Sequence, residues 1–183
     1  MKIINCKSDN DYNIARKIII DYNTWLNMDL EYQGLHNELN NLNVMYGFEK
    51  RGAFIIGINE NHEYVGGVGI RNHRNNICEM KRLYVYHKYA GLGYGKKLCN
   101  EIISIATELN YEFMYLDTVV RLKAANRIYQ NLGFQDIPPY CNNPDPTARF
   151  MYLSLKKSAQ QGDAPEPATN ADSASQPSNP PAR

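Results

Sequence analysis

Two patterns of apolar residues divide the chain into expected helices and strands. Near the start, apolar residues recur at helical spacing in two segments, which predicts helices from Ser8 or Asp9 to about Met28 and over 34–45. Further on, short apolar runs are bounded by glycine and polar residues, as is typical of strands. The expected strands cover 2–6, 52–58, 64–70, 77–86, 112–118 and 148–155.

Two later segments return to helical spacing, at 96–110 and 122–132, and Gly133 stands where a helix often ends. The resulting order of elements is β-α-α-β-β-β-α-β-α-β-β, in which the next-to-last strand has no assigned range. This order indicates a mixed α/β domain rather than a repeating array of βαβ units.

The charge balance narrows the class of protein. Among 183 residues, 20 Lys and Arg stand against 19 Asp and Glu, which gives a formal net charge of +1. A near-neutral chain without a basic run is not expected to bind nucleic acid through its overall field. No apolar stretch approaches the roughly 18 residues that a membrane span needs. We therefore expect a soluble, cytoplasmic protein with neither a nucleic-acid nor a membrane partner.

Composition changes once along the chain, after Lys157. The segment 158–183 is rich in Pro, Ala and Ser and contains no Ile, Leu, Val or aromatic residue. Such a segment cannot bury enough apolar surface to offset the entropy lost on ordering, so it is predicted to be disordered. The expected organisation is one folded domain over 1–157 and a disordered tail over 158–183.

Four cysteines, at 6, 78, 99 and 141, include no Cys-x-x-Cys pair and lie too far apart for a zinc knuckle. The four histidines have no spacing that suggests a metal site either, so no metal is expected. The cysteines are predicted to be reduced, mostly buried thiols with a structural role.

A glycine-rich loop carries the clearest chemical signal. Gly91, Gly93 and Gly95 alternate between a predicted strand and a predicted helix, which leaves backbone N–H groups free to bind an anion. The dinucleotide-binding fingerprint does not fit, because Lys96 stands at its third glycine position. A phosphate-binding Walker A loop does not fit either, since Ala90 stands at its first glycine position. A tight turn without a ligand is the alternative interpretation.

Two segments resemble the motifs of the GNAT (acyl-CoA N-acyltransferase) superfamily. The first is similar to motif A, Arg/Gln-x-x-Gly-x-Gly/Ala after a strand ending in Leu-x-Val, with Gly93 and Gly95 as its glycines and Ala90 in place of Arg or Gln. The second, at 125–134, is similar to motif B, Ala-x-x-x-Tyr-x-x-x-Gly-Phe, although Leu122 replaces the usual Asn. The resemblance covers about residues 1–155.

This resemblance implies a fold and an activity. The fold would be a mixed, mostly antiparallel central sheet flanked by helices. The activity would be direct transfer of an acetyl group from acetyl-CoA to a primary amine of a small molecule, or of a protein, in a ternary complex without metal. The resemblance is also compatible with a homodimer. The departures at Ala90 and Leu122 favour an alternative, a non-catalytic acyl-CoA-binding module.

The resemblance also implies a coenzyme site. The N–H of Leu83 would meet the acyl oxygen, Val85 would bind the pantetheine arm, and the loop amides would bind the diphosphate. Lys88, Lys96 or Lys97 would supply the positive charge that Ala90 lacks. The full set of expected coenzyme contacts is Leu83, Tyr84, Val85, Ala90, Gly91, Leu92, Gly93, Tyr94, Gly95, Lys96 and Asn126.

Two residues are the expected catalytic groups. Tyr129 aligns with the phenol that points at the coenzyme sulfur in the family, and a protonated tyrosine can donate to the leaving thiolate. Glu79 aligns with the general base of histone-acetylating members. Strand alternation would place it on one face with Lys81, Leu83 and Val85, and burial would raise its pKa. Alternatively, Glu79 only pairs with Lys81 or Arg82, and Asp117 or a water molecule is the base.

The sequence gives weaker indications of which residues select the acceptor substrate. Asp29 and Glu31 follow the first predicted helix and could attract a cationic amine. Arg149 and Tyr140 lie near the last predicted strand and could hold a carboxylate.

Overall fold

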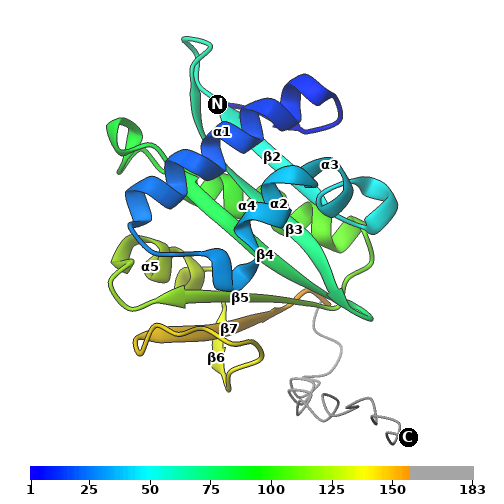
Figure 1. Cartoon of the computed structure of the whole chain (residues 1–183), viewed down its shortest axis with the longest axis vertical. Coiled ribbons are helices and arrows are strands. Elements are labelled where there is room, and N and C mark those ends of the chain that lie inside the picture. Colours follow the sequence, from blue (N-terminus) through cyan, green and yellow to red (C-terminus); the bar gives the residue numbers. More distant parts are fainter. Residues whose placement is uncertain (157–183) are drawn as a thin grey trace, which may run out of the picture.

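The computed structural model describes residues 1–156, so the tail predicted at 158–183 lies outside the described residues. The described residues form a seven-stranded sheet in the order β1-β2-β3-β4-β5-β7-β6 (Figure 1). The strands are β1 (Lys2–Asn5), β2 (Ala53–Ile58), β3 (Tyr64–Arg74), β4 (Ile77–Val85), β5 (Phe113–Val119), β6 (Gln135–Ile137) and β7 (Ala148–Ser154).

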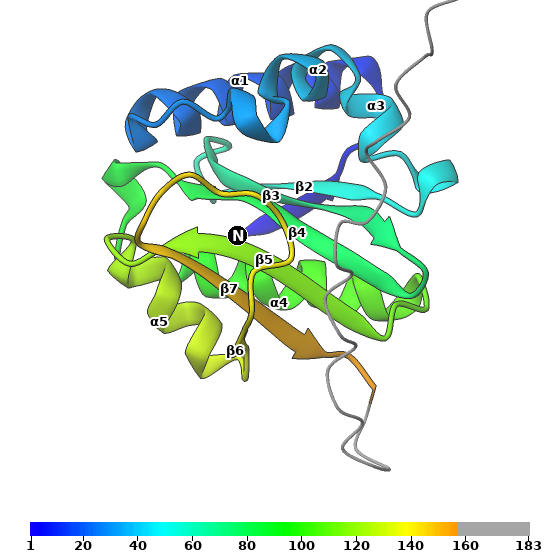
Figure 2. The ribbon, with the colours of Figure 1, turned by 60° about the horizontal axis from the view of Figure 1, so that its bottom comes forward.

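Helices cover both faces of this sheet. Figure 2 shows α1, α2 and α3 on one face and α4 and α5 on the other. The α-helices are α1 (Asp9–Leu26), α2 (Leu35–Asn40), α3 (Leu42–Met45), α4 (Tyr94–Glu108) and α5 (Lys123–Asn131). The short 3₁₀ turns are η1 (Glu31–Gln33), η2 (Phe48–Lys50) and η3 (His87–Tyr89). The predicted mixed sheet flanked by helices is confirmed. In the described residues, no helix is long and apolar enough to cross a membrane.

Strands β4 and β5 separate soon after they meet. They are parallel and pair only over Ile77–Glu79 and Phe113–Tyr115, whereas the other neighbouring strands pair antiparallel. Beyond these three pairs the carboxyl-terminal halves of the two strands diverge, and no ladder closes the space between them. The divergence opens the sheet at the position where the glycine-rich loop follows β4.

Helix α1 closes one face of the sheet. The Ser8 side chain caps its first turn, and the Asp11 carboxylate accepts from the Ser8 N–H in return, which makes a capping box. The buried residues of α1 share one face and pack on the sheet together with Tyr46 and Phe54. The helix ends at Leu26, where Asn27 adopts a left-handed conformation (φ 50°), two residues before the predicted end.

The helix predicted over 34–45 is wrong as a single element. The chain forms α2 and α3 instead, and they are separated at Asn41, whose φ of −130° is not helical. The Asn41 side-chain amide donates to the backbone oxygen of Asn37, so a local polar contact competes with the helix at this position. The short edge strand β6 takes the unassigned next-to-last place in the predicted order.

A β-bulge in β4 changes which side chains share a face. Gly67 of β3 lies opposite Tyr84 and Gly69 lies opposite Lys81, so β4 has an extra residue in this interval. Arg82 adopts φ 61° there. The side chains of Lys81 and Arg82 therefore both extend toward η1 and α2, where they contact Gln33.

The bulge also makes one prediction wrong, namely that Glu79, Lys81, Leu83 and Val85 share one face of the strand. Leu83 and Val85 pack against the core cluster that includes Leu98 of α4, on the opposite side of the sheet from the Lys81 contacts. A period of two holds only while the ladder has no insertion, and the bulge shifts the alternation by one residue.

The cysteines follow the expectation for structural thiols. Cys6, Cys78 and Cys99 are buried and Cys141 is partly buried, all as free thiols. Burial raises the pKa of the Cys99 thiol to about 12, so this sulfur remains protonated at neutral pH.

Candidate active site

A cavity of about 610 Å³ opens where β4 and β5 diverge. Its wall comes from five parts of the chain: the end of α1 with η1, the second half of β4, the glycine-rich loop with the start of α4, the turn from β5 into α5, and Asn143 in the loop before β7. The cavity therefore joins the glycine loop to the opening in the sheet, and a long ligand can lie in it from one to the other.

The glycine-rich loop presents backbone amides to this cavity. Gly91 and Gly93 have φ of 80° and 77°, and a Cβ at either position would meet no other atom within 4 Å. The first intrahelical bond of α4 runs from the Lys97 N–H to the Gly93 oxygen, so the preceding amides of the first turn point out of the helix. Such amides at a helix N-terminus suit an anion such as a diphosphate.

Most of the predicted coenzyme contacts line the cavity. Of the loop residues, Leu92 is exposed and does not line it, whereas Ala90, Gly91, Gly93, Tyr94, Gly95 and Lys96 do. Lys88 pairs with Glu63 at 3.0 Å and does not line the cavity, so Lys96 is the better-placed cation.

Asn126 is the other predicted coenzyme contact that does not reach the cavity lining. Its side-chain amide donates to the backbone oxygens of Val119 and Leu122, and its Oδ1 accepts from Arg149. These bonds fasten the start of α5 to the end of β5. Asn126 thus positions the helix that carries Tyr129.

The bulge leaves Leu83 outside both ladders of β4. Leu83 has no partner residue in β3, and pairing with β5 stops at Glu79. Leu83, Tyr84 and Val85 all line the cavity. Main chain without a register partner beside an open cavity is an arrangement that can polarise a bound carbonyl group.

Tyr129 lies on α5 and lines the cavity, where only 7% of its surface is exposed. Its ring packs against Phe134 with centroids 5.6 Å apart, which fixes the direction of the phenol. Burial raises the pKa of Tyr129 well above its ordinary value, so the phenol is protonated at neutral pH. This state is the one that a proton donor requires.

Glu79 is buried but does not line the cavity. Its carboxylate accepts from Arg71 Nε at 2.8 Å and from the Tyr140 hydroxyl at 3.0 Å, and it lies 3.5 Å from Lys81 Nζ. Burial alone would raise the pKa of Glu79, but the charges of Lys81 and Arg71 outweigh it and lower the pKa to about 2. The predicted raised pKa is therefore wrong, and the alternative pairing with Lys81 is what the structure has.

Asp117 is a carboxylate that does line the cavity. It accepts from Gln33 Nε2 at 2.9 Å and from Asn143 Nδ2 at 2.8 Å, and Lys81 Nζ donates to it at 3.3 Å. Lys81 thus joins the carboxylates of β4 and β5 across the opening in the sheet.

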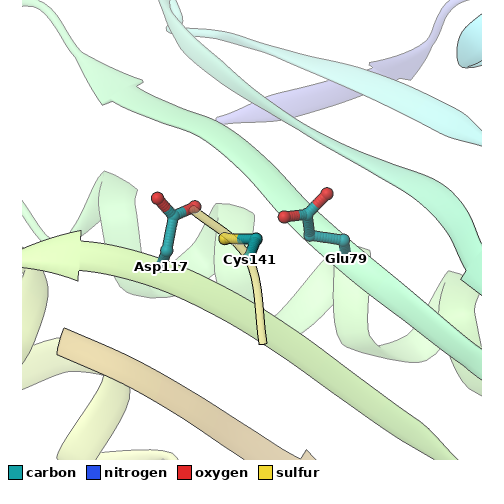
Figure 3. Close-up of side chains that lie close together, drawn as sticks. All are labelled: Glu79, Asp117 and Cys141. Atoms are coloured by element: carbon teal, nitrogen blue, oxygen red, sulfur yellow. The ribbon is translucent and has the colours of Figure 1, made fainter. Parts of the chain in front are cut away.

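Figure 3 shows Glu79, Asp117 and Cys141 converging from β4, β5 and the loop that precedes β7. One potential ligand atom from each lies within 4.8 Å of the others, a spacing that can hold a metal ion. The Lys81 ammonium group already lies between the two carboxylates, at 3.5 Å and 3.3 Å. A metal ion there would have to displace Lys81. We therefore interpret Glu79, Asp117 and Lys81 as an internal network of ion pairs.

The residues predicted to select the substrate have other contacts. The carboxylates of Asp29 and Glu31 accept from backbone N–H groups nearby, and neither residue lines the cavity. Arg149 pairs with Asp136 at 2.9 Å and does not line it either. Tyr140 binds Glu79 from outside the cavity lining.

Sequence reasoning missed the ion pair between Arg82 and Glu38. Arg82 Nη2 lies 2.6 Å from Glu38 Oε2, and both side chains are buried. The Tyr46 hydroxyl also donates to Glu38 at 2.7 Å. A signal was present, because Glu38 shares helical spacing with Leu35 and Leu42 and is therefore a charge on an apolar face.

The Glu79 network makes a prediction about acid stability. A carboxylate whose pKa is about 2 when folded, against an ordinary 4.5, stabilises the fold above about pH 4.5, and this contribution is lost as pH falls toward 2. We expect Glu79→Gln to lower the free energy of unfolding at pH 7 by about 3 kcal/mol, because the half-buried Arg71 loses its carboxylate partner and the buried Lys81 keeps only Asp117. Urea unfolding measured between pH 7 and pH 3 checks this.

A surface carboxylate provides the matched control. Glu112 pairs with Lys156 on the surface, so Glu112→Gln is expected to change the free energy of unfolding by less than about 1 kcal/mol. The difference between Glu79→Gln and the unsubstituted protein should shrink below pH 4.5. A difference that stays constant down to pH 3 contradicts the ionised state assigned to Glu79.

A cavity between diverging parallel strands, with loop amides at one end and a protonated tyrosine inside, agrees with the family that the two sequence motifs resemble. The chain belongs to the acetyltransferase (GNAT) family, whose model matches residues 19–134. An uncharacterised N-acetyltransferase of Schizosaccharomyces pombe is 34% identical over 152 residues, which cover 82% of this chain and 93% of the relative.

Solved structures share the fold. An acetyltransferase of the GNAT family from Staphylococcus aureus has a TM-score of 0.67 at 26% identity, covering 85% of this chain and 100% of the other. An acetyltransferase from Salmonella typhimurium, solved with its cofactor acetyl-CoA, has a TM-score of 0.58 at 18% identity, covering 90% and 100%. These comparisons confirm the predicted family.

Proposed function

We propose that this protein transfers the acetyl group of acetyl-CoA directly to a primary amine of a small molecule, within a ternary complex. The observation that carries this proposal is the continuity of the cavity, which runs from the loop amides past Leu83 to Tyr129. The Salmonella typhimurium structure with acetyl-CoA supports the choice of cosubstrate.

Different residues of the cavity bind the coenzyme and stabilise the charge that develops in the reaction. The amides at the start of α4 and the Lys96 side chain bind the diphosphate of the coenzyme. The main chain at Leu83 donates to the thioester oxygen and stabilises the negative charge that develops there when the amine attacks. Val85 holds the pantetheine arm by its main chain.

Attack forms a bond from the amine nitrogen to the carbonyl carbon, and collapse of the intermediate breaks the bond from carbon to sulfur. Tyr129 gives its proton to the leaving thiolate and regains one from solvent. The amine loses its proton to a base. Asp117 is the better-placed carboxylate for this step because it lines the cavity and Glu79 does not.

Thiol release from acetyl-CoA, measured across a panel of primary amines with mass detection of the products, tests the proposal. We expect thiol release that depends on the amine, with one N-acetyl product for each thiol. Calorimetry of acetyl-CoA binding accompanies the assay. Coenzyme binding without turnover on any amine would instead support the alternative, a non-catalytic acyl-CoA-binding module.

A further inference from the structure

We propose that the acceptor is an amine that also carries a carboxylate, as an α-amino acid does, and that Arg121 binds this carboxylate. The inference rests on the proposed function and adds the chemical class of the acceptor.

The first observation is the charge at the acceptor end of the cavity. Asp117 lines this end, and its charge is balanced by Lys81 at 3.3 Å. Behind the wall, Glu38 is paired with Arg82 and Glu79 with Arg71. Each of the three carboxylates thus already has a cation within the protein.

The consequence is a wall without a free negative charge. A polyamine would bring several ammonium groups beside Arg121, which has no carboxylate partner among the described residues, and beside Lys81 and Arg82, whose charges are already balanced. Like charges in a partly desolvated site repel, and the wall holds no unpaired carboxylate to offset the repulsion. The structure therefore disfavours a polycationic acceptor.

The second observation concerns the contacts of the Arg121 side chain, in the turn between β5 and α5. Its Nη2 donates to the backbone oxygen of Leu26 at 2.7 Å, at the carboxyl-terminal end of α1. Among the described residues, no carboxylate forms an ion pair with Arg121. The contact with Leu26 orients the guanidinium group. Arg121 is otherwise exposed and interacts with the charge of Asp145, and its N–H donors that have no protein partner can bind a ligand.

A planar guanidinium with free N–H donors matches a carboxylate in two parallel hydrogen bonds. An α-amino acid would place its carboxylate on Arg121 and its amine toward the opening between β4 and β5. The positive charge of Arg121 favours the neutral form of the bound amine, which is the form that attacks a thioester.

The third observation is the aromatic surface beside Arg121. Trp25 lines the cavity and is 51% exposed, and its ring centroid lies 5.6 Å from that of Tyr84 and 6.3 Å from that of Tyr22. This surface is apolar and fixed by ring packing. This aromatic surface can pack against the carbon skeleton of an amino acid, and it carries no charge that would attract or repel the ligand.

Matched acceptor pairs test the proposal. Thiol release from acetyl-CoA is measured with L-amino acids, with the carboxamide of each, and with spermidine as the polycation. We expect kcat/KM for the best acid to exceed that for its own amide by about 10- to 100-fold, the size expected for charge-assisted hydrogen bonds. Spermidine should be the poorest acceptor.

Variants of Arg121 test whether this residue causes the preference for acids over amides. Arg121→Gln should raise KM for the acid about 10- to 100-fold more than KM for the amide, whereas Arg121→Lys should restore part of the difference. Arg127 lines the same cavity from α5, so Arg127→Gln serves as a control for the loss of one positive charge. It should change acid and amide turnover by the same factor.

The outcomes separate the two proposals. A preference for amides or spermidine over acids, or an Arg121→Gln variant that keeps the acid preference, overturns the inference and leaves the acetyltransferase intact. Failure to bind acetyl-CoA, or binding without turnover on any amine, overturns the proposed function and the inference with it.

Discussion

Replacing Tyr129 with Phe is expected to lower kcat about 100-fold, the lower range for loss of a general acid, and to leave coenzyme affinity nearly unchanged. The substitution removes one oxygen from a side chain whose ring packs on Phe134, so the fold and the shape of the cavity are kept. The raised pKa of Tyr129 means that the phenol carries its proton throughout the neutral range. Steady-state thiol release and calorimetry with acetyl-CoA measure the two quantities separately.

Tyr152 provides the control for this substitution. Its hydroxyl donates to Gln135 on the edge of the sheet, and it does not line the cavity. Tyr152→Phe should leave both kcat and coenzyme affinity unchanged. Full activity of Tyr129→Phe would remove the tyrosine from the mechanism.

Replacing Gly93 with Val is expected to weaken coenzyme binding by at least about 100-fold, to below detection by calorimetry. Gly93 is the N-cap of α4 and lines the cavity, and a Cβ there meets no protein atom within 4 Å. The added side chain would therefore fill space that the diphosphate needs rather than clash with the fold. A β-branched residue at φ 77° also strains the loop that aims the amides.

Gly34 separates these two effects. It has φ 72°, and a Cβ there also meets nothing within 4 Å, but Gly34 does not line the cavity. Gly34→Val should lose a similar amount of stability and keep coenzyme affinity. If Gly93→Val binds acetyl-CoA as tightly as the unsubstituted protein, the loop is not the diphosphate site.

The sequence predicts those parts of the fold that depend on local pattern. Apolar periodicity is enough to locate α1, α4 and α5 and the long strands, because each element buries one face. Alternating glycines before a helix are enough to locate the loop, since the requirement for free amides is a property of a few neighbouring residues. The role of Tyr129 is a prediction of another kind, because it comes from the resemblance of 125–134 to motif B and not from local pattern.

The parts that depend on contacts between distant segments could not be predicted. The bulge at Arg82 arises from pairing with β3 and moves Leu83 and Val85 to the other face. The pKa of Glu79 depends on Arg71, eight residues away on another strand, and on the Lys81 ammonium group. Asn41 is a local exception: its side chain bonds the backbone of Asn37 and interrupts a helix whose apolar spacing continues without a break.

The ion pair between Lys81 and Asp117 connects the two central strands beyond the point where their ladder ends. Main-chain hydrogen bonds set the spacing between strands elsewhere in the sheet, but here two side chains meet across the gap, with Lys81 Nζ 3.3 Å from Asp117 Oδ1. A span made of side chains can be lengthened or shortened by single substitutions without breaking a ladder. Relatives can thus adapt the width of the entrance to acceptors of different size while the coenzyme half of the molecule stays as it is.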